Sequence, residues 1–292
     1  MTFSFNFALE DDSTTTTTTT SSISTTLSTP SIPSKRLRNG ERFIYHPNAT
    51  SMAFSPVHVG TQTFQIVNTT DANFVTRTGV ISSILITSDV QTNVYEGGFK
   101  LWECALDLVK FVEMEDTPMA TTVLELGCGH GLPGIHALLR GAERVTFSDY
   151  NKEVLELTTC PNVLRNVDKQ LFKKADFYAG AWSSMSRYME EVEQQTHEQM
   201  QFDLILTAET IYTEAVAVEL YQTIKRHLRR ASNARALVAA KKYYFGTNGS
   251  VQHFVGLVQA DGVFRAETVW EERDGRSNIR EIVQLTYLDA AL

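Results

Sequence analysis

From about residue 90 onward, short apolar runs alternate with stretches whose hydrophobic residues recur every three or four positions. Short apolar runs are typical of buried strands, and the longer spacing is typical of helices with one buried face. The predicted strands are, in order, Val123–Leu126, Val145–Tyr150, Ala175–Ala181, Phe202–Glu209 and Arg235–Tyr244. Strands joined by helical crossovers predict an α/β fold, a mostly parallel sheet with helices on both faces.

Two of the crossovers have an apolar helical face, one made of Leu132, Ile135, Leu138 and Leu139 and the other of Val216, Leu220, Ile224 and Leu228. The chain closes with two further strand-like runs, Val263–Glu272 and Ser277–Leu288. The link between these runs contains an Asp-Gly pair, which is a frequent two-residue hairpin turn. We therefore predict a C-terminal antiparallel hairpin at the end of the sheet.

The chain before this domain has a different character. Residues 1–39 are rich in Ser and Thr, and such a segment buries too little apolar surface to offset the entropy of ordering. We therefore predict a disordered N-terminal region there, although its FSFNF string is strand-like. Residues 40–90 contain two β-type runs, Phe64–Val67 and Val80–Thr87, which predict an appendage of short strands. The main domain then spans residues 91–292.

Composition narrows the class of protein. The 292 residues carry a formal net charge of −8, which argues against broad nucleic-acid binding through a basic surface. The basic string Lys35–Arg38 is either half of a nuclear-import patch or a solvated turn. No apolar run approaches the roughly 20 residues that span a bilayer, and the opening residues lack a signal peptide's basic segment. Cys104, Cys128 and Cys160 have no metal-ligand spacing, so we expect a soluble intracellular protein without a metal site.

A glycine-rich loop follows the first predicted strand of the main domain. The string VLELGCGHGLPG places Gly127, Gly129 and Gly131 between that strand and a helix that begins near Leu132. Glycine lets the backbone turn tightly and approach a ligand closely. In an open α/β sheet, the crevice at the carboxyl end of the strands is where ligands bind. The loop therefore predicts a binding site at the end of the first strand.

An acidic residue ends the next strand. Asp149, followed by Tyr150, can reach both hydroxyls of a ribose bound across the loop. The alternative is that Asp149 caps the following helix. The third strand ends in Gly180, Ala181 and Trp182, which offer small residues beside a flat wall for an adenine ring. Trp182 is equally explained as a core tryptophan.

The identity of the nucleotide rests on two further residues. The segment from Gly129 also satisfies the dinucleotide pattern GxGxxG, which keeps an NAD-dependent oxidoreductase open. In such a site the first glycine follows the strand directly, and Gly127 holds that place. Glu125 would repel two phosphates but would suit the ammonium of an amino-acid group. S-adenosylmethionine has adenosine at one end and an α-amino acid at the other, and we predict it as the cofactor.

The chain resembles a known family at this point. ELGCGHG with the acidic strand end resembles the class I methyltransferases, whose fold is a Rossmann-like, seven-stranded mixed sheet. The strings VYEGGFKLWEC (Val94–Cys104), DYN, AETIY (Ala208–Tyr212) and KKYYFGTNGSV (Lys241–Val251) resemble the histidine protein methyltransferases. The resemblance covers residues 90–292 and the first eight residues.

The resemblance also implies site residues. Trp102, Glu103 and Ala208 join the glycines, Asp149 and Tyr150 in the cofactor pocket. From the residues alone, the preferred interpretation of Trp102 is a core residue on a helix face, and that of Glu103 is an exposed carboxylate. Glu209 and Tyr212 match an acidic-x-x-Tyr motif at the acceptor site, with Glu209 as the catalytic carboxylate and Tyr212 shaping the pocket. Glu209 would otherwise cap the next helix.

The implied function is transfer of a methyl group from S-adenosylmethionine to the tele nitrogen of a histidine in a large-subunit ribosomal protein. A lysine methyltransferase of the same fold and a non-enzymatic ribosome-assembly factor are the alternatives beside the NAD-dependent enzyme. We expect a monomer in the cytoplasm and nucleus, with a protein substrate and without direct binding of nucleic acid or membrane.

Overall fold

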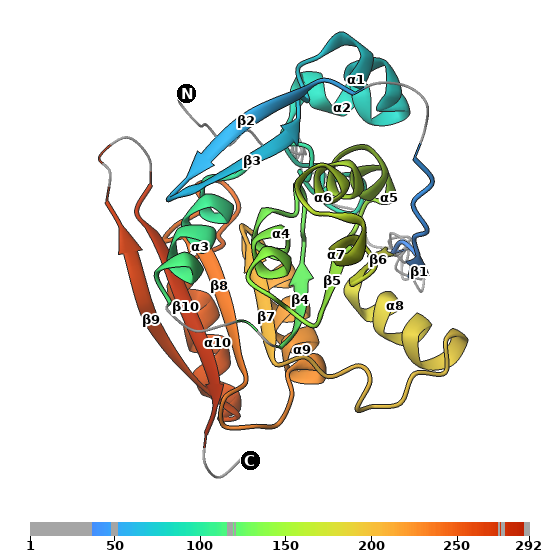
Figure 1. The fold of residues 1–292 in the computed structure, drawn as a ribbon. Coiled ribbons are helices and arrows are strands. Elements are labelled where there is room, and N and C mark those ends of the chain that lie inside the picture. Colours follow the sequence, from blue (N-terminus) through green and yellow to red (C-terminus); the bar gives the residue numbers. More distant parts are fainter. Residues whose placement is uncertain are drawn as a thin grey trace, which may run out of the picture.

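The computed structural model describes residues 37–47, 52–115, 119, 121–273, 275 and 278–288. The FSFNF string and the Thr-rich stretch therefore lie outside the described residues. A single sheet forms the centre of the molecule (Figure 1). In spatial order its eight strands are β1 (Glu41–Arg42), β6 (Ala175–Ala179), β5 (Arg144–Asp149), β4 (Thr122–Leu126), β7 (Leu204–Ala208), β8 (Arg235–Lys241), β10 (Arg280–Tyr287) and β9 (Phe264–Glu272).

The strand directions confirm the predicted mixed sheet of a class I methyltransferase fold. Strands β4 to β8 are parallel, and β10 runs antiparallel to both β8 and β9, as a C-terminal hairpin requires. The short strand β1 adds an eighth, antiparallel member at the β6 edge, where Glu41 pairs with Ala179. The sequence did not predict β1, because two charged residues carry no strand pattern.

Helices cover both faces of the sheet, as predicted. The described helices of the main domain are α3 (Glu103–Met114), α4 (Leu132–Leu139), α5 (Lys152–Val154), a π-helical turn (Leu155–Thr159), α6 (Cys160–Asn166), α7 (Lys169–Phe172), α8 (Trp182–Arg187), a second π-helical turn (Tyr188–Val192), α9 (Glu214–His227) and α10 (Val251–Asp261). Figure 1 shows α3 and α4 in front of the sheet and α9 and α10 behind it. Successive residues of β4 serve both layers: Val123 packs with α3 and α4, whereas Leu124 packs with α9 and α10.

Residues 52–90 form a separate layer, and one prediction there is wrong. The run Phe64–Val67 lies in β3 (Gln62–Val67), which pairs with β2 (Phe54–Val59) as a hairpin. The run Val80–Thr87, predicted as a strand, is helical instead. It spans the end of a 3₁₀ turn (Gly79–Ile81) and α2 (Ser82–Thr87), after α1 (Ala72–Arg77). Its apolar residues Ile81, Ile84 and Leu85 have helical spacing and pack together against Phe74 and Tyr95.

Three smaller predictions are also corrected. Leu139 was placed on the buried face of its helix but is 42% exposed, because it is the last residue of α4. Leu228 is buried but follows the end of α9. Arg38 and Asn39, predicted to be disordered, pack on the domain, since the backbone N–H of Ala181 donates to the carbonyl of Arg38 at 3.2 Å.

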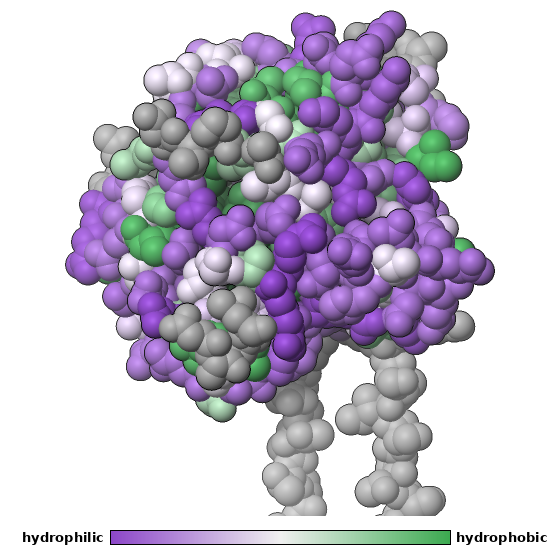
Figure 2. All heavy atoms as spheres, turned by 60° about the horizontal axis from the view of Figure 1, so that its bottom comes forward, coloured by the Kyte–Doolittle hydropathy of each residue, from purple (hydrophilic) through white to green (hydrophobic). Residues whose placement is uncertain are grey.

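Among the described residues, no helix is long and apolar enough to cross a membrane. Figure 2 turns the bottom of Figure 1 toward the viewer, and the face that it shows is mainly hydrophilic. Small apolar spots on that face are separated by polar side chains. The parallel strands end at the opposite edge of the sheet, which is where ligands bind in open α/β folds.

A buried ion pair connects α3 to β10. The guanidinium of Arg280 donates to both carboxylate oxygens of Asp107, and the two residues are only 5% and 2% exposed. Burial raises the pKa of Asp107, although the hydrogen bond from Arg280 opposes this shift. The pair fixes the helix that begins at the pocket against the last strand of the sheet.

We predict that Asp107→Ala lowers the free energy of unfolding by about 3–5 kcal/mol, because it removes the carboxylate bound by a buried guanidinium. Asp176→Ala is the comparison, since its partner Arg42 is 45% exposed at the side chain and such pairs contribute at most about 1 kcal/mol. Urea denaturation measures both. Equal losses in the two variants would contradict a special role for the Asp107–Arg280 pair.

Candidate active site

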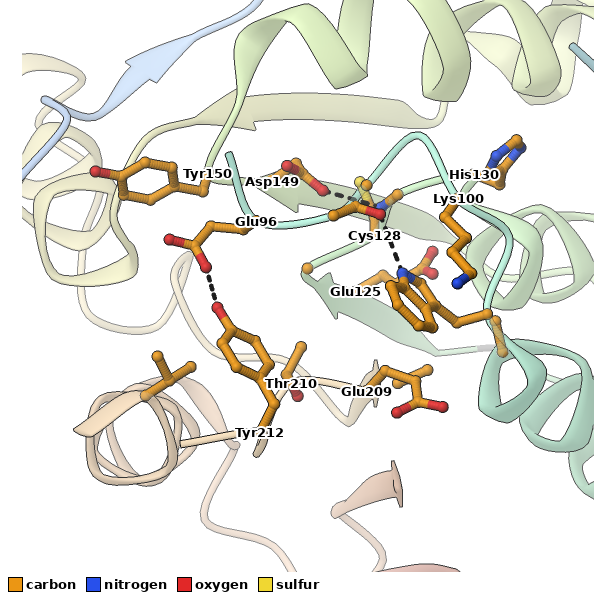
Figure 3. A pocket seen from close by; sticks show the side chains of 18 of the residues that line it. Glu96, Lys100, Glu125, Cys128, His130, Asp149, Tyr150, Glu209, Thr210 and Tyr212 are labelled. Atoms are coloured by element: carbon orange, nitrogen blue, oxygen red, sulfur yellow. Dashed lines mark hydrogen bonds between the residues drawn. The ribbon is translucent and has the colours of Figure 1, made fainter. Parts of the chain in front are cut away.

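A pocket opens at the carboxyl ends of β4, β5, β6 and β7. The segment 93–102, which precedes α3, and the first turns of α9 complete its walls (Figure 3). The structure brings together nearly all the residues that the sequence predicted. Those that line the pocket are Trp102, Glu125, Gly127, Gly129, Gly131, Asp149, Tyr150, Gly180, Ala181, Trp182, Ala208, Glu209 and Tyr212.

The glycine loop needs glycine for its backbone shape. Gly127, Gly129 and Gly131 have φ values of 64°, 48° and 73°, which side chains with a Cβ rarely adopt. A Cβ on Gly127 would also lie 2.7 Å from Cγ2 of Thr210 across the pocket. A Cβ on Gly129 would lie 3.2 Å from the carbonyl oxygen of Gly98. The loop is therefore a cradle formed by backbone, and side chains there would narrow the cavity.

Asp149 and Glu125 are buried carboxylates that hold this loop. The carboxylate of Asp149 accepts from the backbone N–H groups of Gly129 and Asn151, both at 3.0 Å. Burial raises the pKa of Asp149 to about 6. Glu125 accepts from the N–H of Gly134 at 2.9 Å, and burial raises its pKa strongly. Asp149 thus holds the backbone of Asn151, the residue that precedes α5, but does not itself cap that helix, and it lines the pocket as predicted.

Cys128 lies inside the glycine loop and is 5% exposed. Its sulfur lies 3.6 Å from the hydroxyl of Thr159, and burial raises the pKa of the thiol well above its usual value. A thiol that stays protonated is a poor nucleophile. Tight packing inside the loop therefore accounts for Cys128, and its buried thiol is unsuited to covalent catalysis.

The chain segment 38–43, which we call the strap, packs against the outside of the β6 side of the pocket. It runs so close to Gly180 that a Cβ there would lie 2.3 Å from the carbonyl oxygen of Asn39. The guanidinium of Arg38 donates to Glu153 at 3.0 Å and to the carbonyl of Val94 at 3.2 Å. Its backbone N–H donates to the hydroxyl of Tyr150 at 3.3 Å. The sequence did not predict that the strap contacts residues of the pocket, because the only signal at Arg38 was the basic string Lys35–Arg38.

Trp182 packs as a core residue behind the sheet and also lines the pocket, where its role as a wall for adenine stays a prediction. It is the first residue of α8. Trp102 precedes α3, lines the pocket, and donates from its ring N–H to the carbonyl of Gly97 at 3.0 Å. Glu103, in contrast, is turned toward Lys241 at 3.9 Å and is not one of the described lining residues. The alternative of an exposed Glu103 is wrong, because its side chain is 12% exposed.

Glu96 is a pocket residue that sequence reasoning missed. Its carboxylate accepts from the hydroxyl of Tyr212 on the opposite wall and from the backbone N–H of Asn93. Its own N–H donates to Asn151 at 3.0 Å, and burial raises the pKa of its carboxyl group. The string EGG was part of the family resemblance, but nothing in the sequence placed its glutamate opposite Tyr212.

Glu209 lines the pocket but its carboxylate is engaged on the other side. One oxygen accepts from the hydroxyl of Tyr244 at 2.7 Å, and the other is buried 3.4 Å from Nζ of Lys241. Figure 3 shows the carboxylate pointing away from Tyr212. The alternative role of Glu209 as a helix cap is wrong, since Thr213 caps α9 by accepting from Val216. The backbone of Glu209 has a positive φ of 60°, which is a constrained conformation for a residue with a side chain.

The comparisons with known proteins agree with this geometry. A family model described as lysine methyltransferase matches residues 82–260. A histidine protein methyltransferase 1 homolog from Dictyostelium discoideum is 39% identical over 204 residues, covering 70% of this chain and 62% of the relative. Histidine protein methyltransferase 1 from Schizosaccharomyces pombe is 30% identical, with 66% of this chain and 70% of the relative covered.

Two further matches place the chain more broadly. A protein N-lysine methyltransferase from Xenopus tropicalis is 31% identical over 145 residues, covering 49% of this chain and 60% of that protein. The crystal structure of a proposed methyltransferase complexed with SAH has a TM-score of 0.51 and 10% identity, covering 83% of this chain and 58% of that one. This likeness shows the fold.

The chain spans between about half and two thirds of the length of the first curated relatives it matches. The matched region includes the whole pocket from Asn93 to Glu219. The family assignment confirms S-adenosylmethionine as the cofactor and separates the chain from the NAD-dependent oxidoreductases. The chain belongs to the lysine methyltransferase family, and within it to the group of the histidine protein methyltransferases.

Proposed function

We propose that the chain transfers the methyl group of S-adenosylmethionine to a nitrogen of a histidine side chain in a protein. The observation that carries this proposal is the charge of the pocket wall. Among the described residues, five acidic side chains and one lysine line the pocket, namely Glu96, Glu125, Asp149, Glu209, Glu219 and Lys100. Such a wall favours a ligand with a sulfonium and an ammonium, and it opposes a dinucleotide with two phosphates.

The residues present fit S-adenosylmethionine. Asp149 would accept from the ribose hydroxyls, and the backbone cradle of the glycine loop leaves room for the ligand. An ammonium beside Glu125 would offset the cost of burying that carboxylate. Tyr150, Gly180, Ala181 and Trp182 would enclose the adenine ring, and Trp102 and Ala208 complete the wall. When bound, the cofactor supplies an electrophilic methyl group on sulfur.

A histidine acceptor makes modest demands on the protein. The unperturbed pKa of imidazole is near 6.5, so at neutral pH the ring is mostly uncharged and nucleophilic. The protein must orient the ring and select one nitrogen. A carboxylate that accepts the N–H of one ring nitrogen aims the lone pair of the other, and it stabilises the positive charge that develops.

Two carboxylates of the wall are candidates for this role. Glu209 is the sequence-based candidate, and it lies at the carboxyl end of β7 beside Thr210. Its proposed role requires the side chain to turn from Lys241 toward the pocket. Glu96 is the second candidate, because it lies opposite on the segment before α3 and holds Tyr212. We retain Glu209 as the proposal, and Glu96 provides the matched comparison.

The finer parts of the proposal rest on the family resemblance. They are a large-subunit ribosomal protein as acceptor, the tele nitrogen as the position, a monomeric enzyme, and a location in the cytoplasm and nucleus. The 39% identity to a histidine protein methyltransferase favours histidine over lysine. To test the assignment, the protein is incubated with labelled S-adenosylmethionine and proteins extracted from large ribosomal subunits. Mass spectrometry should locate the label on histidine, and methyllysine as the product would support the lysine alternative.

Cofactor affinity should depend on pH through Asp149. Because burial raises its pKa to about 6, the free protein loses this charge as the pH falls through that value. Ribose hydroxyls donate to the ionised form, so affinity should be highest above about pH 7 and weaken toward about pH 5. Asp149→Asn should bind about 1.5–3 kcal/mol more weakly at neutral pH and lose most of this pH dependence. Calorimetry measures both, and equal affinities at neutral pH would remove Asp149 from the binding groups.

Arg38 should support cofactor binding by positioning Tyr150 and the segment before Glu96. We expect Arg38→Ala to raise the dissociation constant about fivefold, near 1 kcal/mol, because its hydrogen bonds join three walls. Arg42→Ala is the matched control on the same strap, since Arg42 pairs with Asp176 and Glu193 outside the pocket. Its effect should stay within about twofold. Melting temperatures are compared in parallel, and equal effects on binding would indicate general loosening of the strap.

The acceptor carboxylate should be revealed by the same change at two positions. We expect Glu209→Gln to keep cofactor affinity and to lower turnover on a histidine acceptor at least about tenfold, or 1.4 kcal/mol. A neutral amide still forms hydrogen bonds but does not offset the charge that grows on the ring. Wild-type activity should rise through the acceptor's pKa, near 6.5 if unperturbed, and then level off.

Single-turnover assays with product analysis measure both variants. A full loss in Glu96→Gln with an active Glu209→Gln would transfer the role to Glu96. Full activity of both variants would contradict a carboxylate role altogether.

A further inference from the structure

The loop that follows β8 exposes two aromatic side chains on either side of a buried one. Phe245 is 77% exposed and Tyr243 is 46% exposed, whereas Tyr244 between them is 4% exposed. Large aromatic side chains contribute strongly to protein interfaces when they become buried. We call Tyr243 and Phe245 the aromatic pair. Neither residue lines the pocket among the residues described, so the proposed chemistry leaves the pair unexplained.

The pair is fixed to the acceptor wall of the pocket. Tyr244 points inward, and its hydroxyl donates to Glu209 at 2.7 Å. The end of the loop also packs on that wall, since a Cβ on Gly249 would lie 2.3 Å from the carbonyl oxygen of Ile211. The N–H of Tyr244 donates to the carbonyl of Gly249 at 2.9 Å, which closes the loop. The loop that carries the pair is therefore attached, through Tyr244 and Gly249, to the chain segment that contains Glu209 and Tyr212.

The other side of the loop is tied to the C-terminal hairpin. The carbonyl of Tyr243 accepts from the side chain of Asn278 at 3.2 Å, and the N–H of Lys242 donates to the carbonyl of Ile279 at 2.8 Å. The ammonium of Lys242 lies 2.9 Å from Glu281. Because the ammonium of Lys242 is paired with Glu281, it adds no net charge beside the aromatic pair. The pair therefore presents mainly apolar aromatic surface.

We propose that the aromatic pair binds the segment of the acceptor protein that flanks the modified residue, through an apolar side chain of that segment. This inference rests on the proposed function. A polypeptide whose side chain enters the pocket beside Glu209 and Tyr212 must continue over the protein surface, and the exposed pair is carried by the loop that is attached to this segment. A cofactor enclosed by the glycine loop does not extend there.

The test uses the full chain, labelled S-adenosylmethionine and proteins extracted from large ribosomal subunits as the acceptor probe. Phe245→Ala and Tyr243→Ala should each raise the KM for the acceptor about tenfold. Both should leave kcat and the cofactor dissociation constant within about twofold. Phe245→Leu should retain part of the binding, and the effect should vary little with salt, because apolar contacts are not screened.

Met114→Ala is the matched control, since Met114 is 75% exposed at the far end of α3 from the pocket. Its acceptor KM should equal that of the wild type. An unchanged acceptor KM in Phe245→Ala would overturn the proposal, as would an equal loss of cofactor affinity. If the wild type is a dimer and Phe245→Ala is a monomer with an unchanged acceptor KM, the pair is a contact between two copies of the chain. That result would also overturn the docking proposal. Histidine labelling distinguishes failure of the proposed function from failure of the docking proposal. If the wild type labels no histidine, the proposed function is overturned. If the wild type labels histidine but Phe245→Ala leaves the acceptor KM unchanged, only the docking proposal is overturned.

Discussion

The left-handed turn after β4 is the constraint on which the centre of the pocket depends. Three glycines with positive φ bring the chain from the strand into α4 within a few residues. This turn presents the N–H of Gly129 to Asp149 on β5, and the N–H of Gly134 to Glu125 on β4. It also leaves room for Gly98, whose carbonyl oxygen would lie only 3.2 Å from a Cβ on Gly129. Residues with a Cβ would strain the turn and separate these neighbours.

Each of four pocket carboxylates has its own hydrogen-bond partners, which explains how so much acidic charge is tolerated in one place. Asp149 and Glu125 accept backbone N–H groups. Glu96 accepts the hydroxyl of Tyr212, and Glu209 has the ammonium of Lys241 and the hydroxyl of Tyr244. Burial still raises the pKa values of Glu96, Glu125 and Asp149. A cationic ligand would stabilise the ionised form of these buried carboxylates. The acidic pocket therefore favours the binding of S-adenosylmethionine, which carries positive charge.

Local patterns made most of the fold and the cofactor side of the site predictable. The strand ends, the glycine loop and Asp149 are each marked by residues that are neighbours in sequence, so their placement around one pocket could be predicted. What the sequence did not reveal depends on contacts between distant segments. Arg38 and Tyr150 are 112 residues apart, and Glu96 and Tyr212 are 116 apart. The run Val80–Thr87 was assigned to the wrong element for a different reason, because its β-branched composition obscured its helical spacing.

Lys241 is buried between two carboxylates behind the acceptor side of the pocket. Its ammonium lies 3.9 Å from Glu103, 3.4 Å from Glu209 and 5.2 Å from the ring centroid of Trp102. The positive charge of Lys241 therefore offsets the negative charge of Glu209 while that carboxylate faces away from the pocket. In the proposed reaction, a histidine acceptor is mostly neutral at first and becomes positive as the methyl group is transferred. Glu209 can stabilise that charge only after its side chain turns from Lys241 toward the ring, so the proposed chemistry requires this buried contact to break.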